Sequence, residues 1–386
     1  MAGYIYLSNS NKPSASAPTE SKIINLTNMS IPYLKVANEL GYSLNMGVSS
    51  ETIASNTSFS INFFKSYVYR NPLDFSSNIK AYKALCKAIR ENEVEAIHCN
   101  TPVGGIIGRL AGKKCRVKKI IYQAHGFHFY KGAPKKNWLL YYPAERFLAR
   151  FTDAIITINK EDFEAAKQFK LKRGGKVYFV HGVGITTADF QNIPADVRKE
   201  LRNDLGVSDD EILLISVGEL NKNKNNAVII KAISELKNPK IKYALCGVGE
   251  EMQALVSLCK ELGVEKQVQF LGFRNDVAKL YKAADIFVMP SLREGLSRSM
   301  MEAMASGLPC VASAIRGNVD LIEEGKNGYL CASKDAKSFS EAILKLASSK
   351  ELRSEISKKN LEKIKEYDIS VVEKEMMEIY RDVLGK

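Results

Sequence analysis

The chain has 386 residues, of which 45% are apolar and 26% charged, and its formal net charge is +13. This length exceeds what one hydrophobic core usually supports, so we expect two globular domains. No apolar run approaches the roughly 18–20 residues that span a bilayer, and residues 1–12 lack the basic and apolar regions of a signal peptide, which together predict a cytoplasmic protein. The 7 cysteines include no C-x-x-C pair and indicate neither a disulfide framework nor a zinc site.

Short apolar runs alternate with helical patterns through the first half, which predicts an α/β domain with a parallel sheet. We expect its strands at residues 4–7, 94–98, 119–123, 154–158 and 177–180. The expected helices are residues 31–40, 79–90, 105–111, 137–150 and 161–168.

Two loops of this half carry candidate acceptor-binding groups. Asn9, in the polar loop 8–11 after the first strand, is a candidate contact for acceptor or phosphate. His125 and His128 follow the strand at 119–123, so we expect them at the carboxyl edge of the sheet, where ligands bind in open α/β folds. A histidine at a strand end is more often a structural hydrogen-bond partner, and we interpret His98 and His181 in that way.

The excess of positive over negative charge lies entirely in the first half. Residues 1–182 hold 26 Lys and Arg against 12 Asp and Glu, whereas the remainder holds 30 against 31. The basic residues at 113–119 and 131–150 lie beside an aromatic and aliphatic stretch at 138–147, a combination that suits an anionic membrane surface. Two alternatives remain. Nucleic-acid binding lacks a recognisable module, and the stretch 138–147 is also compatible with an ordinary core helix with solvated lysines.

The second half begins after residue 182, where we place the domain boundary. Its expected strands are residues 212–217, 243–246, 268–271, 286–289 and 309–314. The first three of them end in loops that open with Gly218, Gly247 and Gly272. The last expected helices, at 336–346, 351–366 and 371–384, carry no evident chemistry.

The stretch 291–317 follows the apolar run 286–289 and reads as a loop, a helix beginning near Ser297, and a second strand. Glu294 and Glu302 bracket the helix start with seven residues between them. The backbone N–H groups of Gly295, Leu296 and Ser297 would face the positive end of the helix dipole, where a phosphate can bind. Glu294 would then accept hydrogen bonds from hydroxyls of a glycosyl group, and Glu302 from those of a ribose. Either carboxylate could instead make a simple contact with the helix dipole or lie on a solvated helix face.

The complete string, Glu-Gly-Leu-Ser with a second Glu eight positions after the first, resembles the donor-site motif of the family-four retaining glycosyltransferases of GT-B fold. The runs 125–134 and 158–162 are similar to enzymes of bacterial capsular and exopolysaccharide assembly. The resemblance implies two Rossmann-like domains facing a cleft. Residues 1–182 would bind the acceptor, with a last helix at about 367–386 packing back on them, and residues 183–366 would bind the donor.

The resemblance also implies the reaction. A sugar would move with retention from a nucleoside diphosphate sugar, most readily a UDP-sugar, to a polyprenyl-diphosphate-linked saccharide, at the inner face of the cell membrane and without metal or other cofactor. His125 matches the histidine that contacts the reacting sugar in this family. The loop that opens with Gly272 and contains Phe273 and Arg274 matches the segment whose backbone holds the nucleobase.

A cation for the leaving diphosphate is expected in the loop after Gly218. Lys224 lies at a helix start, where the dipole disfavours a lysine, so a functional reason is favoured and charge neutralisation of the diphosphate is its expected role. The family usually carries an arginine where this chain has Glu219, and Lys222 is the candidate replacement.

Two other classes of function remain open at this point. A sugar-nucleotide epimerase or a phosphorylase uses a similar two-domain fold. A non-catalytic scaffold would bind nucleotide sugars at a membrane without turnover.

Overall fold

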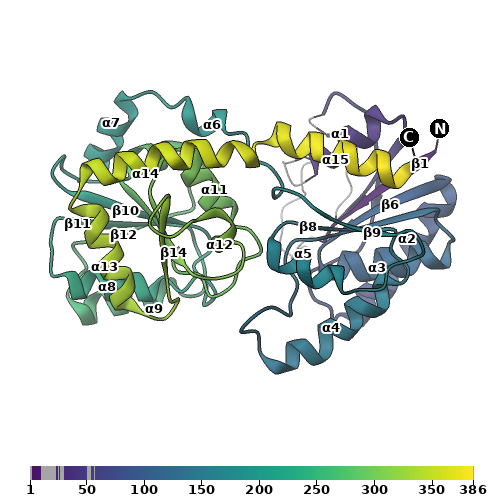
Figure 1. The fold of residues 1–386 in the computed structure, drawn as a ribbon, viewed down its shortest axis with the longest axis horizontal. Coiled ribbons are helices and arrows are strands. Elements are labelled where there is room, and N and C mark those ends of the chain that lie inside the picture. The colour runs from purple at the N-terminus through teal and green to yellow at the C-terminus, as the bar shows by residue number, and fades with distance from the viewer. Residues whose placement is uncertain are drawn as a thin grey trace. The chain divides into compact units, whose positions relative to one another are not determined.

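The computed structural model describes residues 2–9, 23–24, 26, 30–49, 54–55 and 57–385. The chain forms two compact units (Figure 1). The first unit comprises Met1–Gly184 and Ile369–Lys386, and the second comprises Ile185–Asp368. Among the described residues, no helix is both long enough and apolar enough to cross a bilayer.

The first unit is built on a seven-stranded parallel sheet with the order β5-β3-β1-β6-β7-β8-β9. Its strands are β1 Gly3–Leu7, β3 Ser43–Val48, β5 Ile61–Lys65, β6 Val94–Asn100, β7 Lys119–Ala124, β8 Ala154–Thr157 and β9 Lys176–Phe179. Every neighbouring pair is parallel, and the central strands are buried almost throughout. A separate short pair joins β2 Ile23–Ile24 and β4 Ala54–Ser55.

Six helices cover this sheet in the described part of the first unit. They are α1 Ile31–Glu39, α2 Phe75–Glu91, α3 Pro102–Lys114, α4 Lys135–Ala149, α5 Lys160–Lys167 and α15 Ile369–Leu384. Figure 1 shows α1 and α15 together on one side of the sheet and α2, α3 and α4 on the other. Glycines let α3 lie close to the sheet, because a Cβ at Gly105 would stand 2.3 Å from the ring of Tyr122.

The second unit contains a six-stranded parallel sheet with the order β12-β11-β10-β13-β14-β15. The strands are β10 Ile212–Val217, β11 Ile241–Cys246, β12 Val268–Gly272, β13 Ile286–Met289, β14 Cys310–Ser313 and β15 Gly328–Cys331. Apolar clusters on both faces bury this sheet, as the continuous apolar runs of its strands require.

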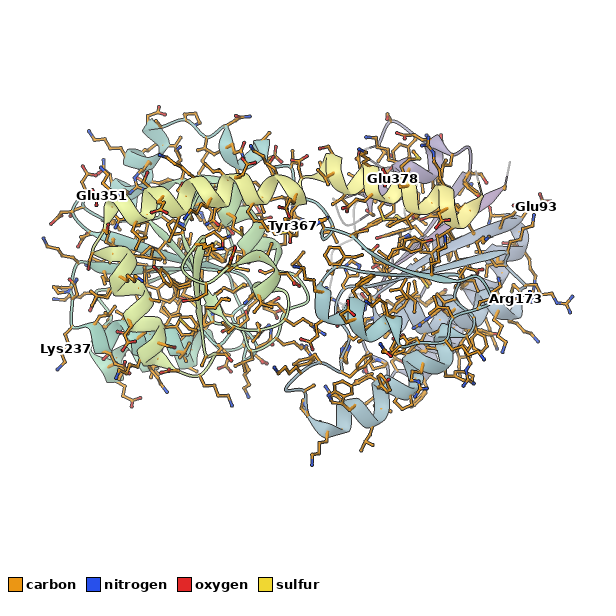
Figure 2. The ribbon with its side chains drawn as sticks, in the orientation of Figure 1. Glu93, Arg173, Lys237, Glu351, Tyr367 and Glu378 are labelled. Atoms are coloured by element: carbon orange, nitrogen blue, oxygen red, sulfur yellow. The ribbon has the colours of Figure 1, made fainter. Side chains whose placement is uncertain are left out.

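The helices of the second unit precede, connect or follow these strands. They are α6 Ala188–Gln191, α7 Asp196–Asp204, α8 Ala227–Leu236, α9 Met252–Leu262, α10 Val277–Ala283, α11 Arg298–Ala305, α12 Asn318–Leu321, α13 Ala336–Ala347 and α14 Lys350–Lys363. A 3₁₀ turn, Ile364–Tyr367, follows α14. The hydroxyl of Tyr367 (labelled in Figure 2) donates to the backbone oxygen of Asp320 at 3.4 Å and so ties this turn to the unit.

The predicted α/β fold with two parallel sheets is confirmed, and most expected elements lie within three residues of their predicted ends. Five strands, β2, β3, β4, β5 and β15, and four helices, α6, α7, α10 and α12, were not predicted. The single helix expected at 351–366 is wrong in its last turn, because α14 ends at Lys363 and the chain continues as a 3₁₀ turn.

Each sheet has a point at which the strand order reverses, and ligands in open α/β sheets bind beside such points. In the second unit the reversal lies between β10 and β13, so the loops that begin at Gly218 and Pro290 flank it. In the first unit it lies between β1 and β6, beside the segments that hold Asn9 and Thr101.

Candidate functional site

The loop between β13 and α11 presents the start of a helix, as predicted. Ser297 is the N-cap residue, and its hydroxyl accepts a hydrogen bond from the backbone N–H of Met300 at 3.3 Å. In the described part of the chain, no acceptor is bonded to the backbone N–H groups of Gly295 and Leu296. The turn therefore offers unpaired amides beside the positive end of a helix dipole.

A neighbouring loop holds this turn in place. A Cβ at Gly317, whose φ is +81°, would stand 2.2 Å from the backbone oxygen of Gly295, so only glycine permits the contact. The buried Arg316 donates from Nε to the backbone oxygen of Glu294 at 3.2 Å. Neither Arg316 nor Gly317 was predicted as a site residue, although both end the stretch that carries the motif.

Lys224 and Glu294 form an ion pair with 2.8 Å between Nζ and Oε1. Both side chains are largely buried, with relative exposures of 23% and 15%. Gly218 makes room for the lysine, because a Cβ there would lie 3.2 Å from Cε of Lys224. The structure thus brings together three residues that were predicted separately, at the point where the strand order of the second unit reverses.

Asparagines join the loops after β10 and β13. Asn223 donates from Nδ2 to the backbone oxygen of Arg293 at 2.9 Å, and the backbone N–H of Leu292 donates to the oxygen of Asn223 at 2.8 Å. Asn225 adopts a left-handed φ of 53° and donates to the backbone oxygen of Pro290 at 3.1 Å. These bonds fix Lys224 beside Glu294. The three asparagines at 223, 225 and 226, on either side of Lys224, were the available sequence signal.

Glu302 lies on α11 and pairs with Arg298 one turn earlier, at 2.8 Å between Nε and Oε1. Its side chain is only 13% exposed, and burial raises the pKa of the Glu302 carboxyl, an effect that the guanidinium of Arg298 partly offsets. Tyr281 lies beside this carboxylate, and its hydroxyl donates to the backbone oxygen of Ser299 at 3.1 Å.

The remaining predicted donor-binding residues lie on neighbouring loops of the same unit. Phe273 is 74% exposed. Arg274 makes a two-point ion pair with Asp276, at 2.7 and 2.6 Å, and this bond lowers the pKa of the Asp276 carboxyl. Lys222 and Glu219 are exposed, and within the described residues neither forms an ion pair. The structure therefore does not bring Lys222 to the Lys224–Glu294 pair.

In the first unit, His125 lies at the carboxyl end of β7 and its Nε2 is 3.0 Å from Oδ1 of Asn100, the last residue of β6. Burial lowers the pKa of the His125 imidazole to about 4, so the ring is neutral at pH 7. With the Asn100 oxygen as acceptor, Nε2 carries the proton and Nδ1 is left as a hydrogen-bond acceptor. Asn100 is fully buried, and its Nδ2 has no partner within the described residues.

The loop after His125 is anchored on both sides. The backbone N–H of Phe127 donates to Oδ2 of the buried Asp162 at 3.0 Å. Asn137, on α4, donates from Nδ2 to the backbone oxygen of His128 at 2.9 Å, and the His128 ring lies 4.7 Å from that of Tyr141. His128 is therefore packed against α4, whereas His125 faces Asn100.

The backbone N–H of Asn9 donates to Oγ1 of Thr101 at 3.3 Å, which brings the loop after β1 to the start of α3. Thr101 has a φ of 65° and a ψ of 162°, a region that is essentially restricted to glycine. Residues 10 and 11 of this predicted loop lie outside the described residues.

The other two histidines have structural partners on α15. His98 is fully buried, and its Nδ1 lies 2.5 Å from the hydroxyl of Tyr380. His181 pairs with Glu375, at 2.5 Å between Nδ1 and Oε1. Among the described residues, no group of three or more His, Cys, Asp or Glu is placed to hold a metal ion.

Comparison with known proteins gives the family. Residues 197–363 match the family model of glycosyl transferases group 1, and residues 45–159 match that of glycosyl transferase 4-like proteins. EpsD of Bacillus subtilis, itself named as a glycosyltransferase, is 34% identical over 91% of this chain and 92% of its own. The chain belongs to the group 1, or family-four, glycosyltransferases.

Other relatives and solved structures agree with this family and with the predicted GT-B fold. An Escherichia coli enzyme named UDP-Gal:alpha-D-GlcNAc-diphosphoundecaprenol alpha-1,3-galactosyltransferase is 28% identical over 75% of this chain and 76% of its own. The structure of Anabaena Alr3699/HepE in complex with UDP superposes with a TM-score of 0.76 at 19% identity, over 98% of this chain and 99% of that one. The lipopolysaccharide glycosyltransferase WaaG superposes with a TM-score of 0.72 at 15% identity, over 100% of both chains.

Proposed function

We propose that this glycosyltransferase moves a sugar, with retention of anomeric configuration, from a UDP-sugar to a hydroxyl of a polyprenyl-diphosphate-linked saccharide. Two relatives support the acceptor class through their names, the Escherichia coli galactosyltransferase above and a Campylobacter jejuni enzyme that acts on a diphospho-undecaprenol-linked sugar. The UDP bound in the structure of the Anabaena protein supports uracil as the base of the donor nucleotide. The similarity to EpsD supports a role in exopolysaccharide assembly.

The observation that carries the donor assignment is the Lys224–Glu294 ion pair beside the amides of Gly295 and Leu296. The amides would hold the distal phosphate, and Lys224 would balance the charge that develops on the diphosphate as the glycosidic bond breaks. Glu294 would keep the ammonium oriented while its second oxygen accepts hydrogen bonds from the transferred sugar. The phosphate charge is then balanced by protein groups alone.

Glu302 would bind the ribose through hydrogen bonds to its hydroxyls. Its ionised carboxylate has two oxygens that can accept hydrogen bonds from two neighbouring hydroxyls, and Arg298 holds one of them. Phe273, which is exposed, would lie beside the uracil ring, and the N–H groups of Arg274 and its neighbours would bond to its edge. Because the Arg274 guanidinium is bound to Asp276, we assign a role to its backbone rather than to its charge.

The reaction that we propose breaks the bond between the anomeric carbon and the phosphate oxygen and forms a bond from that carbon to the acceptor oxygen on the same face. The proton of the acceptor hydroxyl passes to an oxygen of the leaving diphosphate. His125, neutral at pH 7, would orient a sugar hydroxyl, because its Nδ1 is an acceptor while Nε2–H is bound to Asn100. Asn9 and His128 are assigned to the acceptor side, His128 through the position of its loop.

The test is a transfer assay with the purified protein. Radiolabelled UDP-glucose, UDP-galactose, UDP-N-acetylglucosamine and UDP-N-acetylgalactosamine would each be incubated with undecaprenyl-diphosphate-linked N-acetylglucosamine. We expect label in the lipid fraction with one of these donors and none when the lipid is omitted. Donor interconversion without a lipid would instead indicate an epimerase. Binding of a UDP-sugar with neither transfer nor hydrolysis, across a panel of lipid-linked mono- and disaccharides, would indicate a non-catalytic scaffold.

A further inference from the structure

The solvent side of the α2–α3–α4 layer carries an unusual set of exposed apolar side chains. Among the described residues of the first unit, every large apolar side chain that is more than a third exposed lies on these helices or on the loop before α2. They are Leu73, Phe75, Ile79, Leu110, Trp138, Leu139, Leu140 and Phe147. Three adjacent helices that expose apolar groups on one layer form a surface that a water-soluble protein seldom leaves uncovered.

On α4 the exposed stripe is the apolar one. Leu139 is 79% exposed and Leu140 is 64% exposed, whereas Leu148 and Ala149 pack into the core. Lys136, Arg146 and Arg150 continue the same exposed stripe. The alternative of an ordinary core helix fits Tyr141 and Tyr142, which pack against the core of the first unit, but not the exposed Leu139, Leu140 and Phe147. Figure 2 shows side chains extending from α4 on the side away from the sheet.

A second apolar cluster stands at the start of α2, and no sequence pattern indicated it. Leu73 is 73% exposed, Phe75 is 70% exposed and Ile79 is 57% exposed. Phe75 and Ile79 are four residues apart and share one face of the helix. Basic residues follow them along the exposed stripe of α2, at Lys83 and Lys87.

The charge of this layer is strongly positive. Residues 70–150 contain sixteen Lys and Arg against five Asp and Glu, which accounts for most of the excess charge of the first half. Four of these five acids are already engaged, since Glu145 pairs with the buried Arg109, Glu95 with Lys118 and Glu91 with Lys87, and Asp74 caps α2. A partner for this surface must therefore be anionic and apolar at once.

Most of the exposed apolar groups lie at one end of the layer, whereas the basic residues run along its whole length. Leu110 and Phe147 are the two exposed apolar residues that lie towards the other end. Both α2 and α4 start at the carboxyl edge of the sheet, because each follows a strand of a parallel sheet. Phe75, Ile79 and the run from Trp138 to Leu140 lie in the first turns of their helices, at that edge. The basic residues extend to the opposite ends, at Arg90 and Arg150.

We propose that the α2–α3–α4 layer docks on an anionic lipid bilayer in a tilted orientation, with the apolar first turns of α2 and α4 inserted among the headgroups. The lysines and arginines then lie over the anionic headgroups, whose negative potential attracts them. The tilt brings the carboxyl edge of the sheet, and with it the loop of His125, to the level of the headgroups. The diphosphate of a polyprenyl-linked acceptor lies at that level. This orientation would therefore present the acceptor to the loop of His125, a benefit that rests on the proposed function.

The chain contains a single tryptophan, Trp138, which lies in the inserting segment and is 41% exposed. Its fluorescence therefore reports insertion without a label. The full chain would be mixed with vesicles of phosphatidylglycerol and phosphatidylcholine and with vesicles of phosphatidylcholine alone. We expect a blue shift of emission, and quenching by brominated acyl chains, only with the anionic vesicles.

Two double variants test the apolar clusters of α4 and α2 separately. Leu139→Ser combined with Leu140→Ser, and Phe75→Ser combined with Ile79→Ser, should each weaken partitioning by about tenfold or more, because burial of each CH₂ group contributes to membrane binding. The control is Leu344→Ser, which changes a 45% exposed leucine of the second unit and should leave partitioning unchanged. All of these side chains are exposed, so unfolding by urea should be unaffected.

Three results would overturn the proposal. Vesicle binding that is abolished by salt without any blue shift would mean charge attraction without insertion. Equal binding by the Leu344→Ser control and the two double variants would remove the apolar clusters from the contact. A dimer in light scattering that the double variants dissociate would identify the surface as an interface between copies of this chain. None of these measurements uses donor or acceptor, so they fail or succeed independently of the transfer assay.

Discussion

The site residues at the carboxyl edges of the two sheets differ in charge. In the second unit, the edge carries three ion pairs, Lys224–Glu294, Arg298–Glu302 and Arg274–Asp276. In the first unit, the predicted site residue at this edge is neutral, since His125 is bound to the amide of Asn100 and its lowered pKa keeps the imidazole uncharged at pH 7.

This difference shows what each edge is suited to bind. Paired charges that are only partly buried can exchange one partner for a phosphate without leaving an unpaired charge behind, which suits an anionic diphosphate. A neutral imidazole and amide suit the hydroxyls of a saccharide, because hydrogen bonds need no charge compensation. Much of the positive charge of the first unit lies on α2, α3 and α4 instead, where it would serve the proposed contact with a bilayer rather than chemistry at the sheet edge.

Breaking the Lys224–Glu294 pair should have the largest effect on activity. We expect Glu294→Gln to lower kcat by about 100-fold or more, because the transferred sugar loses a charged acceptor and Lys224 loses the group that orients it. Affinity for UDP should stay the same or increase, since the ammonium is no longer neutralised. Steady-state transfer kinetics and calorimetry with UDP separate the two effects.

The matched control is Asp276→Asn, which removes the carboxylate of another ion pair on the same edge. Its kcat should change little by comparison. Equal activity of the two variants would remove Glu294 from the site.

His125 is the counterpart in the first unit. We expect His125→Ala to lower kcat by about tenfold to 100-fold through loss of an oriented hydrogen bond to sugar, with UDP affinity unchanged because the nucleotide is assigned to the other unit. The control is His181→Gln, since His181 pairs with Glu375 on α15 and should affect thermal stability without affecting kcat. The assignment fails if both variants lose stability and retain turnover.

The sequence predicted some of these features and not others, for physical reasons. Strands β10 and β13 were predicted to the residue because each is an uninterrupted apolar run bounded by glycine or proline. Strand β3 was missed because Asn45 and Gly47 interrupt its apolar pattern, although the sheet buries both. Gly47 is required there, since a Cβ would lie 2.8 Å from the side chain of Leu7.

Contacts between loops were the least predictable part of the candidate site. The Arg298–Glu302 pair has the spacing of neighbouring residues on one helix and could have been read from sequence. Lys224 and Glu294 are 70 positions apart, and only the adjacency of β10 and β13 brings them together. The apolar start of α2 was missed because the helix was expected to begin at residue 79, after Leu73 and Phe75, and their exposure is visible only in the structure.

The smallest expected effect concerns Glu302. We expect Glu302→Gln to raise the Kd for UDP by about tenfold, the loss expected for one charge-assisted hydrogen bond, and to leave kcat nearly unchanged. The control is Glu355→Gln, which changes an exposed glutamate paired with Lys359 on α14 and should leave UDP affinity unchanged. Calorimetry at pH 7 measures both.

The pH dependence of binding sharpens this prediction. Burial raises the pKa of Glu302, so the carboxyl takes up a proton at a higher pH than an exposed glutamate, and UDP affinity should fall as pH drops through that raised value. The folded protein binds this proton more tightly than the unfolded chain does, so protonation of Glu302 adds to stability, and unfolding linked to this group cannot be the cause of the loss. Because ribose hydroxyls favour the ionised form, binding near this pKa should release protons, which calorimetry in buffers of different ionisation enthalpy detects. Binding without proton release in the wild type, or the same pH dependence in Glu302→Gln, would place the ribose elsewhere.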